Sequence, residues 1–365
     1  MFAFGTGRQS IKGQVHATCR EKIVKAFAKF RPEPGITKID AEEPKPGSHE
    51  VLVKVRVTSV CGTDYHIYKW DEWAQAHIKP PRIIGHEFAG EIVQVASDVT
   101  THKVGDMVAA ESHIGCGRCY QCQTGNSHIC ERLRIIGVDV DGSFAEYVKI
   151  PEQNAWPIPS EVPTETASVL EPLGNAVHAA FAADITGSHV CIFGCGPVGL
   201  SAVALTSVSG ALSVTAVDIN DYRLRLAKTM GASKVINSKA ADAVAEVHKE
   251  TDGRGAGVVL EMSGNEIAIR NAFRAVRNGG TVILFGLPPG EVRLNVGDDV
   301  IFKEAHVRGI VGREIFKTWY VLDDLLTSKK IDLRPLITHR MSLNQIDDAM
   351  KLVATGECGK IVLSP

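Results

Sequence analysis

The stretch HVCIFGCGPVGL, residues 189–200, constrains the fold of this chain more than any other feature. A short apolar run leads into the pattern G-x-G-x-x-G, which is formed by Gly194, Gly196 and Gly199. In a strand–turn–helix unit the first glycine permits the tight turn, the second lets the backbone approach a pyrophosphate, and the third lets the helix pack on the strand. The helix N-terminus then presents its amide groups to the phosphates. The motif predicts a dinucleotide-binding site.

The next apolar run, SVTAVD, ends in Asp218, where a ribose-binding carboxylate is expected. Such a carboxylate accepts hydrogen bonds from the adenosine ribose and repels a 2′-phosphate, which favours NAD over NADP. Arg223 qualifies this, because a nearby arginine can accommodate the phosphate. Asp218 could alternatively cap a helix that is expected to start near Asp221. We expect NAD as the cofactor.

Apolar segments alternate with helical segments through the middle of the chain, a pattern typical of a doubly wound parallel α/β sheet. Gly231 and Gly279 are expected at the C-caps of two of the helices. Loops at the carboxyl ends of the strands should line the nicotinamide half of the cofactor site. Six strands are expected, near 189–193, 213–218, 234–236, 257–262, 281–285 and 306–311. Additional cofactor contacts are expected from Val198, Phe285, Gly286, Leu287, Ile310 and Val311.

Composition narrows the class of protein further. The stretch between Asp184 and Asp218 contains no Asp, Glu, Lys or Arg, and it is long enough for a membrane span. Five glycines and Pro197 interrupt it. A buried strand, helix and strand are therefore expected there. A length of 365 residues, with 44% hydrophobic and 22% charged residues, predicts an ordinary globular protein of two domains. Without a long basic stripe, nucleic-acid binding has no electrostatic support.

The first twenty residues contain Arg8, Lys12 and Arg20 and no acid, and they lack the apolar core of a secretory signal. Such leaders can be transit peptides, but we favour a frayed extension over 1–21. We therefore expect a cytoplasmic protein. Its nine cysteines are expected to be reduced thiols and metal ligands rather than disulfides.

Four cysteines are crowded into the loop HIGCGRCYQCQTGNSHIC, residues 113–130. Their spacing, C-x2-C-x2-C-x7-C, lets one loop wrap a tetrahedral zinc ion. An iron–sulfur cluster is the competing interpretation, and a disulfide pair is a third. Four thiolates leave no open coordination position for a substrate, so this site is expected to be structural. The four residues are Cys116, Cys119, Cys122 and Cys130.

A second group of metal-ligand residue types stands upstream, in CGTDYHIY and GHEFAGE. Cys61, His86 and Glu87 offer a thiolate, an imidazole and a carboxylate, and catalytic zinc typically has three protein ligands and an open position. Alone, Cys61 could belong to the core and His86 could be a hydrogen-bonded structural residue. The joint pattern favours a catalytic metal site.

With the glycine motif, GHE and the four-cysteine spacing make the chain similar to the zinc-dependent medium-chain dehydrogenases of the alcohol dehydrogenase superfamily. The resemblance covers roughly Lys25 to the C-terminus. It implies a mostly-β GroES-like catalytic domain over 1–170 with a structural zinc lobe at 113–131, a NAD-binding Rossmann domain over 171–312, and a return of 313–365 to the first domain. It also implies two zinc ions per chain and a homo-oligomer, with a tetramer expected.

The same resemblance assigns Cys61 and His86 as ligands of the catalytic zinc. Two carboxylates compete for the remaining place: Glu87, and Glu171 at the start of EPLGNAV. Glu171 is expected to bind the zinc directly or to exchange with water during turnover. In the plainer interpretation it is an acid at a helix N-terminus, where the helix dipole favours it.

The stretches CGTDYHIYKWDEWAQ, ESHIGCG, LEPLGNAVHAAF and GIVGREIFKTWY resemble the branch of this superfamily that oxidises the C3 hydroxyl of L-threonine. The resemblance implies 2-amino-3-oxobutanoate as product and NAD as hydride acceptor. Tyr65 stands where most of these relatives have leucine. The alternatives are a polyol or secondary-alcohol dehydrogenase, of the sorbitol or butanediol type, and a structural protein that merely binds NAD.

Roles follow for several polar residues. Thr63 is expected to take the substrate proton and pass it to His66, which exchanges with solvent, although a turn-capping threonine and a surface histidine are the plainer interpretation. A zwitterionic substrate needs partners for an ammonium and a carboxylate. The candidates by motif position are His113, Arg313, Glu314 and Trp319, of which Arg313 and Glu314 could instead form a solvated pair and Trp319 could pack at a subunit interface.

Overall fold

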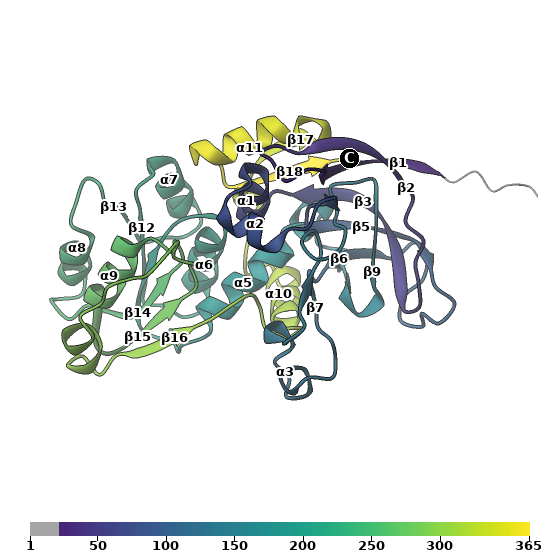
Figure 1. Cartoon of the computed structure of the whole chain (residues 1–365). Helices are drawn as coiled ribbons and strands as arrows, with labels where there is room; N and C mark the ends of the chain where they lie inside the picture. The colour runs from purple at the N-terminus through teal and green to yellow at the C-terminus, as the bar shows by residue number, and fades with distance from the viewer. Residues whose placement is uncertain (1–21) are drawn as a thin grey trace, which may run out of the picture.

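A computed structural model describes residues 22–365, so the expected extension over 1–21 lies outside the described residues. Figure 1 shows two parts side by side: a parallel sheet flanked by helices, and a β-rich part that also contains the C-terminus. Two helices, α5 (Leu170–Ala180) and α10 (Lys317–Thr327), pack on each other between the two parts.

The sheet of the first part has six strands, and all of its pairings are parallel. Its order, β13-β12-β11-β14-β15-β16, reverses direction between β11 and β14, which is where ligands bind in open α/β sheets. The predicted doubly wound sheet is confirmed. Its strands are β11 (His189–Phe193), β12 (Ser213–Asp218), β13 (Lys234–Asn237), β14 (Ala256–Glu261), β15 (Val276–Leu284) and β16 (His306–Gly309).

The charge-free stretch between Asp184 and Asp218 forms β11, α6 and β12, so the expected strand, helix and strand are confirmed. No helix within 22–365 is long and apolar enough to cross a membrane. Gly231, with φ of 109°, follows α7 as predicted, but Gly279 lies inside β15, because α9 already ends at Ala275. The helices of this part are α6 (Pro197–Val208), α7 (Asp221–Thr229), α8 (Ala243–Glu250) and α9 (Glu266–Ala275), with a π-helical turn at Gly297–Ile301.

The β-rich part is built around a seven-stranded sheet, ordered β10-β6-β5-β3-β18-β17, in which β9 also pairs with β3. Smaller sheets are formed by β2-β1-β4 and β7-β8. Because β18 pairs antiparallel with β3, the C-terminal segment joins the sheet of the N-terminal half. The strands are β1 (Ile23–Lys29), β2 (Thr37–Glu42), β3 (Glu50–Ser59), β4 (Arg82–Ile83), β5 (Glu87–Val95), β6 (Met107–Ala110), β7 (His113–Ile114), β8 (Arg134–Ile135), β9 (Tyr147–Pro151), β10 (Ala155–Pro157), β17 (Ile337–Ser342) and β18 (Lys360–Ser364).

The β-rich part also contains short helices. The loop that carries four cysteines projects from the body around α3, as Figure 1 shows. The helices are α1 (Gly62–Lys69), α2 (Glu72–His77), α3 (Tyr120–Gln123), α4 (Thr164–Ala167) and α11 (Ile346–Thr355). Single 3-10 turns occur at Ser127–Ile129, Glu152–Asn154, Arg334–Leu336 and Leu343–Gln345.

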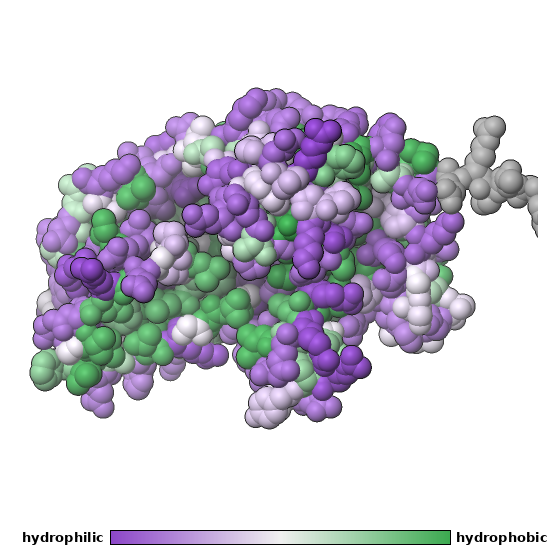
Figure 2. All heavy atoms as spheres, viewed as in Figure 1, coloured by the Kyte–Doolittle hydropathy of each residue, from purple (hydrophilic) through white to green (hydrophobic). Residues whose placement is uncertain are grey.

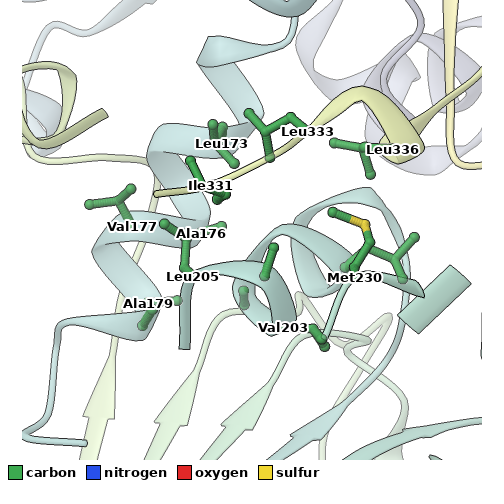
Figure 3. Close-up of a cluster of buried hydrophobic side chains, with 14 of the residues drawn as sticks. Leu173, Ala176, Val177, Ala179, Val203, Leu205, Met230, Ile331, Leu333 and Leu336 are labelled. Atoms are coloured by element: carbon green, nitrogen blue, oxygen red, sulfur yellow. The ribbon is translucent and has the colours of Figure 1, made fainter. Parts of the chain in front are cut away.

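Helix α5 is the packing centre between the two parts. Its side chains Leu173, Ala176 and Val177 face Leu205 of α6 and Ile331 of the segment after α10 (Figure 3). All five belong to one continuous buried cluster. A helix that is buried on most of its surface is held rigidly, so Glu171 in its first turn has a fixed base.

We predict that Gly199→Ala destabilises the sheet part. A Cβ atom at position 199 would lie 1.9 Å from the carbonyl oxygen of Gly194, so strand and helix would have to separate. Overpacking of this kind costs about 1–3 kcal/mol. Gly196→Ala is the matched control, because a Cβ atom there meets nothing within 4 Å. Thermal unfolding checks it, and equal melting temperatures for the two variants would contradict it.

Candidate active site

The pairing of β3 with β5 brings three metal-ligand side chains together. Ser59 at the end of β3 is paired with Glu87 at the start of β5, so Cys61 and His86 come next to each other just beyond the pair. The ligand atoms of Cys61, His86 and Glu87 all lie within 4.8 Å of one another. Gly85, with φ of 92°, admits the ring of Phe144 where a side chain would stand. This is the arrangement that the sequence predicted for the catalytic metal.

The two oxygens of Glu87 are in different situations. Oε2 accepts hydrogen bonds from Ser59 Oγ and from Lys360 Nζ, whereas Oε1 is buried and has no partner among residues 22–365. Lys360 Nζ also donates to the carbonyl of Val60 at 3.0 Å. A buried carboxylate oxygen without a partner, beside a thiol and an imidazole, is the donor set that zinc prefers. These residues fit a zinc ion.

Asp64 is a buried acid that lies against both Cys61 and His86. Its Oδ2 accepts a hydrogen bond from the backbone N–H of Cys61 at 2.9 Å, and its Oδ1 lies 3.6 Å from His86 Nδ1. Burial raises the pKa of Asp64 to about 6, although the charge of His86 opposes the shift. A carboxylate behind a histidine fixes the ring orientation of a metal ligand.

The predicted proton path begins beside Cys61. Thr63 Oγ1 lies 3.7 Å from Cys61 Sγ, and His66 stands one turn further along α1, on the same face. The His66 side chain is 52% exposed, and its Nδ1 lies 2.5 Å from Asp71 Oδ2. The placement suits a path from the metal site to solvent.

The four cysteines of the projecting loop form the other cluster. The sulfur atoms of Cys116, Cys119, Cys122 and Cys130 lie within 4.8 Å of one another, and all four are free thiols. Backbone N–H groups point at them: that of Cys116 donates to Cys130 Sγ at 3.3 Å. Hydrogen bonding, first from the backbone of Arg118, lowers the pKa of Cys116 to about 6. The thiolate is the form that binds metal, so the loop suits a closed structural zinc site.

The glycine motif has the conformation that its spacing predicted. Gly194 has φ of 94°, and Gly196 is the open position that a pyrophosphate can approach. Pro197 occupies the first position of α6, with Val198 next to it. The N-terminus of a helix is thereby presented at the switch point of the sheet.

Asp218 is almost fully buried beneath this loop. Its Oδ2 accepts the N–H of Cys195 at 2.7 Å, and its Oδ1 accepts those of Ile219 and Asn220 at 2.7 and 2.9 Å. The residue that caps α7 is Asn220, so the alternative role of Asp218 as the cap is wrong. Arg223 lies in the first turn of α7, near Gly356.

The other predicted cofactor contacts follow the ends of β15 and β16. Phe285, Gly286 and Leu287 come directly after β15, and Leu287 is 82% exposed. Ile310 and Val311 come directly after β16, and Val311 is 51% exposed. Both loops leave the carboxyl edge of the sheet, where the sequence placed them.

Arg313 and Trp319 are not free to receive a substrate. Both are fully buried, and the indole N–H of Trp319 donates to Glu111 Oε2 at 2.7 Å. The guanidinium of Arg313 donates to Glu111, Ser112, Glu171 and Asn175, which uses all of its N–H groups. This placement contradicts a direct contact of either residue with the charges of a substrate.

Glu171 lies beside the metal cluster rather than in it. Its Oε1 accepts hydrogen bonds from Ser112 Oγ at 2.6 Å and Arg313 Nη1 at 2.7 Å. Burial would raise the pKa of Glu171, but the charges of Arg313 and His86 outweigh it and lower the pKa to about 2. Of the two competing carboxylates, the structure groups Glu87 with Cys61 and His86.

His113 and Glu314 have different surroundings. His113 is packed against Gly312, and burial together with the charge of Arg313 lowers its pKa to about 3. A neutral imidazole can donate or accept a hydrogen bond, but it offers no charge to a carboxylate. Glu314 pairs with Lys317 at 2.8 Å and lines a separate hollow of about 90 Å³ with His178 and Arg308.

Sequence reasoning missed Asp64, Glu111 and Lys360. Asp64 and Glu111 stand inside the quoted stretches CGTDYHIY and ESHIGCG, so their position next to ligand residues was a usable signal. Lys360 carried none, because it lies 273 residues from Glu87 in the sequence.

Comparison with known proteins defines the class. Residues 47–160 match the alcohol dehydrogenase GroES-like domain, and residues 197–328 match the zinc-binding dehydrogenase domain. The chain belongs to the zinc-binding dehydrogenase family, and the resemblance drawn from its motifs is confirmed.

Within that family its relatives are L-threonine 3-dehydrogenases. The chain is 50% identical to the enzyme from Symbiobacterium thermophilum, over 94% of this chain and 98% of the relative. It is 46% identical to the enzyme from Caldanaerobacter subterraneus, over 94% and 99%. A solved zinc-binding dehydrogenase from Sinorhizobium meliloti, bound to NADP, has a TM-score of 0.88 at 30% identity, over 94% of this chain and 100% of that one. The 2R,3R-butanediol dehydrogenase from Bacillus subtilis has a TM-score of 0.83 at 26% identity, over 94% and 99%.

We predict about two zinc ions per chain, one in each cluster. Cys61→Ser should lose one ion and at least about a thousandfold in kcat/KM, because the Lewis acid contributes several kcal/mol, while the melting temperature changes little. Cys119→Ser should lose the other ion and lower the melting temperature. Elemental analysis and thermal unfolding check both, and each variant is the control for the other. A wild-type content of one ion would contradict the two-site assignment.

Proposed function

We propose that this chain is an L-threonine 3-dehydrogenase that uses zinc and NAD. The supporting observation is the juxtaposition of Cys61, His86 and Glu87 in a chain that has a complete dinucleotide fold, with Glu87 Oε1 left without a partner in the part of the chain that the structure describes. The metal neighbourhood reaches the dinucleotide loops, since His113 is packed against Gly312 just after β16. The identity of up to 50% to L-threonine 3-dehydrogenases supports the substrate.

Different residues of the chain have different roles in the reaction. Cys61, His86 and Glu87 would hold the zinc ion. When bound, zinc supplies a Lewis acid for the substrate hydroxyl and NAD supplies the hydride acceptor. Thr63 takes the hydroxyl proton at Oγ1 and gives its own to His66, which exchanges it with solvent while Asp71 holds the ring. Burial of His86 and Glu87 keeps bulk water from the reacting atoms.

Asp218 supports NAD as the cofactor. Its carboxylate lies beneath the glycine motif, bonded to the N–H of Cys195, so its charge is held where the adenosine ribose of a bound dinucleotide is expected. A 2′-phosphate placed there would meet a buried negative charge. Arg223 is close enough in sequence to cover the adenine side, as the family resemblance implies.

The chain should oxidise L-threonine with NAD. We expect a kcat/KM for L-threonine at least about tenfold higher than for sorbitol or 2,3-butanediol, because the identity to L-threonine 3-dehydrogenases favours a site that recognises a zwitterion, and such a site would leave its polar partners unpaired with a diol. NADP in place of NAD should lower the rate. Initial rates with the three substrates and both cofactors check this. A poor rate on L-threonine beside a good rate on a diol would establish the polyol or secondary-alcohol activity instead.

The domain boundaries are part of the same proposal. We place a catalytic domain at 1–170, a NAD-binding domain at 171–312 and a return at 313–365. The pairing of β18 with β3 supports the return. Free thiols in both clusters are consistent with a reducing compartment, so we propose a cytoplasmic location.

We also propose a homo-oligomer, a tetramer by family resemblance, and place one interface at β16. This strand is the edge of the six-stranded sheet, and all four of its residues are exposed. Beside it Ile301 and Phe302 are 66% and 80% exposed. Figure 2 shows apolar side chains gathered over the end of the molecule where Figure 1 places β15 and β16. An unpaired strand edge with apolar neighbours is suited to pairing with another strand.

We predict that Phe302→Asp weakens self-association at this edge, because a charge would have to be buried between two copies. Sedimentation velocity should show smaller species, by about half in mass for a two-fold interface. Val104→Asp is the control, since Val104 is also exposed, at 57%, but lies on the β-rich part. If only the control dissociates the assembly, the interface lies elsewhere.

A further inference from the structure

The mechanism above leaves the buried acid Glu111 without a role. Glu111 directly follows β6 and is fully buried. Its Oε2 accepts hydrogen bonds from Arg313 Nε and Trp319 Nε1, both at 2.7 Å. Its Oε1 accepts them from Arg313 Nη2 and from the backbone N–H of His113, the latter at 2.8 Å. A carboxylate has about four acceptor sites, and all are used, so Glu111 does not itself bind substrate or metal.

Arg313 links Glu111 to Glu171, so the fixed position of Glu111 also constrains Glu171. Its guanidinium is planar, so two bonds to Glu111 on one side fix the direction of the remaining N–H groups. Nη1 donates to Glu171 Oε1 at 2.7 Å, and Nη2 donates to Ser112 Oγ at 2.8 Å. Ser112 Oγ in turn reaches the same Glu171 oxygen at 2.6 Å. Glu171 is therefore held from two directions, and both depend on the stretch that begins with Glu111.

The backbone around Arg313 is shaped to admit it. A Cβ atom on Gly174 of α5 would lie 2.8 Å from Arg313 Cδ. Gly312 has φ of 57°, and a Cβ atom there would lie 2.7 Å from His113 Cε1. Two glycines thus allow three segments to meet on one guanidinium: the end of β6, the first half of α5 and the loop after β16.

Only one of the two side-chain oxygens of Glu171 takes part in this network. Among the residues that the structure describes, both of its side-chain hydrogen bonds go to Oε1. Helix α5 packs on β5, the strand that begins at Glu87, and Ser59 Oγ, which donates to Glu87 Oε2, lies 3.4 Å from the carbonyl oxygen of Ser168 just before α5. Any rotation of Glu171 would change what the metal ligands face.

We propose that Glu111 is a positioning residue of the dehydrogenase site: it holds Arg313, and through Arg313 it fixes Glu171 beside the metal ligands Cys61 and His86. The proposal rests on the proposed function only in requiring a metal at that site. It does not depend on which alcohol is oxidised.

The test is Glu111→Gln in the zinc-loaded enzyme. The amide keeps the shape but turns one acceptor into a donor that faces the donors of Arg313, Trp319 or His113. Loss of an outer partner of a metal site typically costs 10–100-fold in affinity or activity, so we expect kcat to fall about 10–100-fold. Release of the ion that Cys61→Ser lacks, measured with a chromogenic chelator in the absence of substrate, should be about tenfold faster. KM and the Kd for NADH, measured by fluorescence, should change less than about twofold, since neither substrate nor cofactor touches Glu111.

Two further variants separate positioning from mere folding. Glu165→Gln breaks an exposed glutamate–arginine pair with Arg340, remote from the site, and should leave kcat and zinc release unchanged. Glu111→Gln combined with Arg313→Met removes the cation that the single variant strands, so it should recover stability while kcat stays low and zinc release stays fast. It also serves as the test if the single variant does not fold.

Each result with these variants either supports or overturns a specific part of the proposal. Wild-type kcat and zinc release in Glu111→Gln would overturn the proposal. So would a double variant with restored kcat, because Glu111 would then only neutralise Arg313. Fast zinc release in Glu111→Gln, in a protein that proves inactive on L-threonine, would leave the positioning role standing and overturn the substrate.

Discussion

The antiparallel pairing of β3 with β5 is the constraint on which the site depends. Cys61 follows β3 and His86 precedes β5, and only the observed register, with Ser59 opposite Glu87, places their ligand atoms within reach of one ion. A shift of one residue would turn the alternating side chains to the other face of the sheet. The same pairing places Ser59 Oγ on Glu87. Strand register, rather than loop geometry, therefore determines the metal site.

This register also concentrates charged side chains in the protein interior. Four buried acids, Asp64, Glu87, Glu111 and Glu171, surround the site, against three buried groups that can carry positive charge, Lys360, Arg313 and His86. Unpaired buried charges are strongly unfavourable, so a negative excess of this kind calls for a further positive charge. A divalent ion next to Cys61 and His86 would provide it. Within residues 22–365, Glu87 Oε1, His86 Nδ1 and Asp64 Oδ1 are buried there without a hydrogen-bond partner, and they mark the place.

Residues whose role depends on spacing within one motif could be predicted from the sequence. Residues whose role depends on a partner far away in the sequence could not. The glycine motif and the four-cysteine loop each act through a short segment whose geometry its own residues determine, whereas Cys61 and His86, which strand pairing brings together, were predicted from the family resemblance of their motifs. Gly279 was misplaced for a local reason as well: α9 ends at Ala275, and the positive φ is used inside β15 instead.

The errors at Arg313 and Trp319 have a different origin. Both were expected to meet a substrate because of their position in the stretch GIVGREIFKTWY, which resembles a motif of the family. Their partner, Glu111, lies 202 residues from Arg313 and 208 from Trp319 in the sequence, so no local pattern shows that their polar atoms are already used. Lys360 and Glu87 are separated in the same way.

The contact between the two parts of the molecule, called the seam here, contains the buried Arg313, although hydrophobic packing could hold the two parts together more simply. Replacing buried ion pairs by apolar residues is often neutral or stabilising, so stability alone does not explain Arg313. Apolar packing is non-directional, however, whereas a guanidinium with all its donors bonded holds each partner at one angle. Here the partners are the end of β6, the first turn of α5 and the loop that leads from β16. The seam is therefore built for orientation, because a hydride can be transferred only if the metal side and the dinucleotide side keep one geometry.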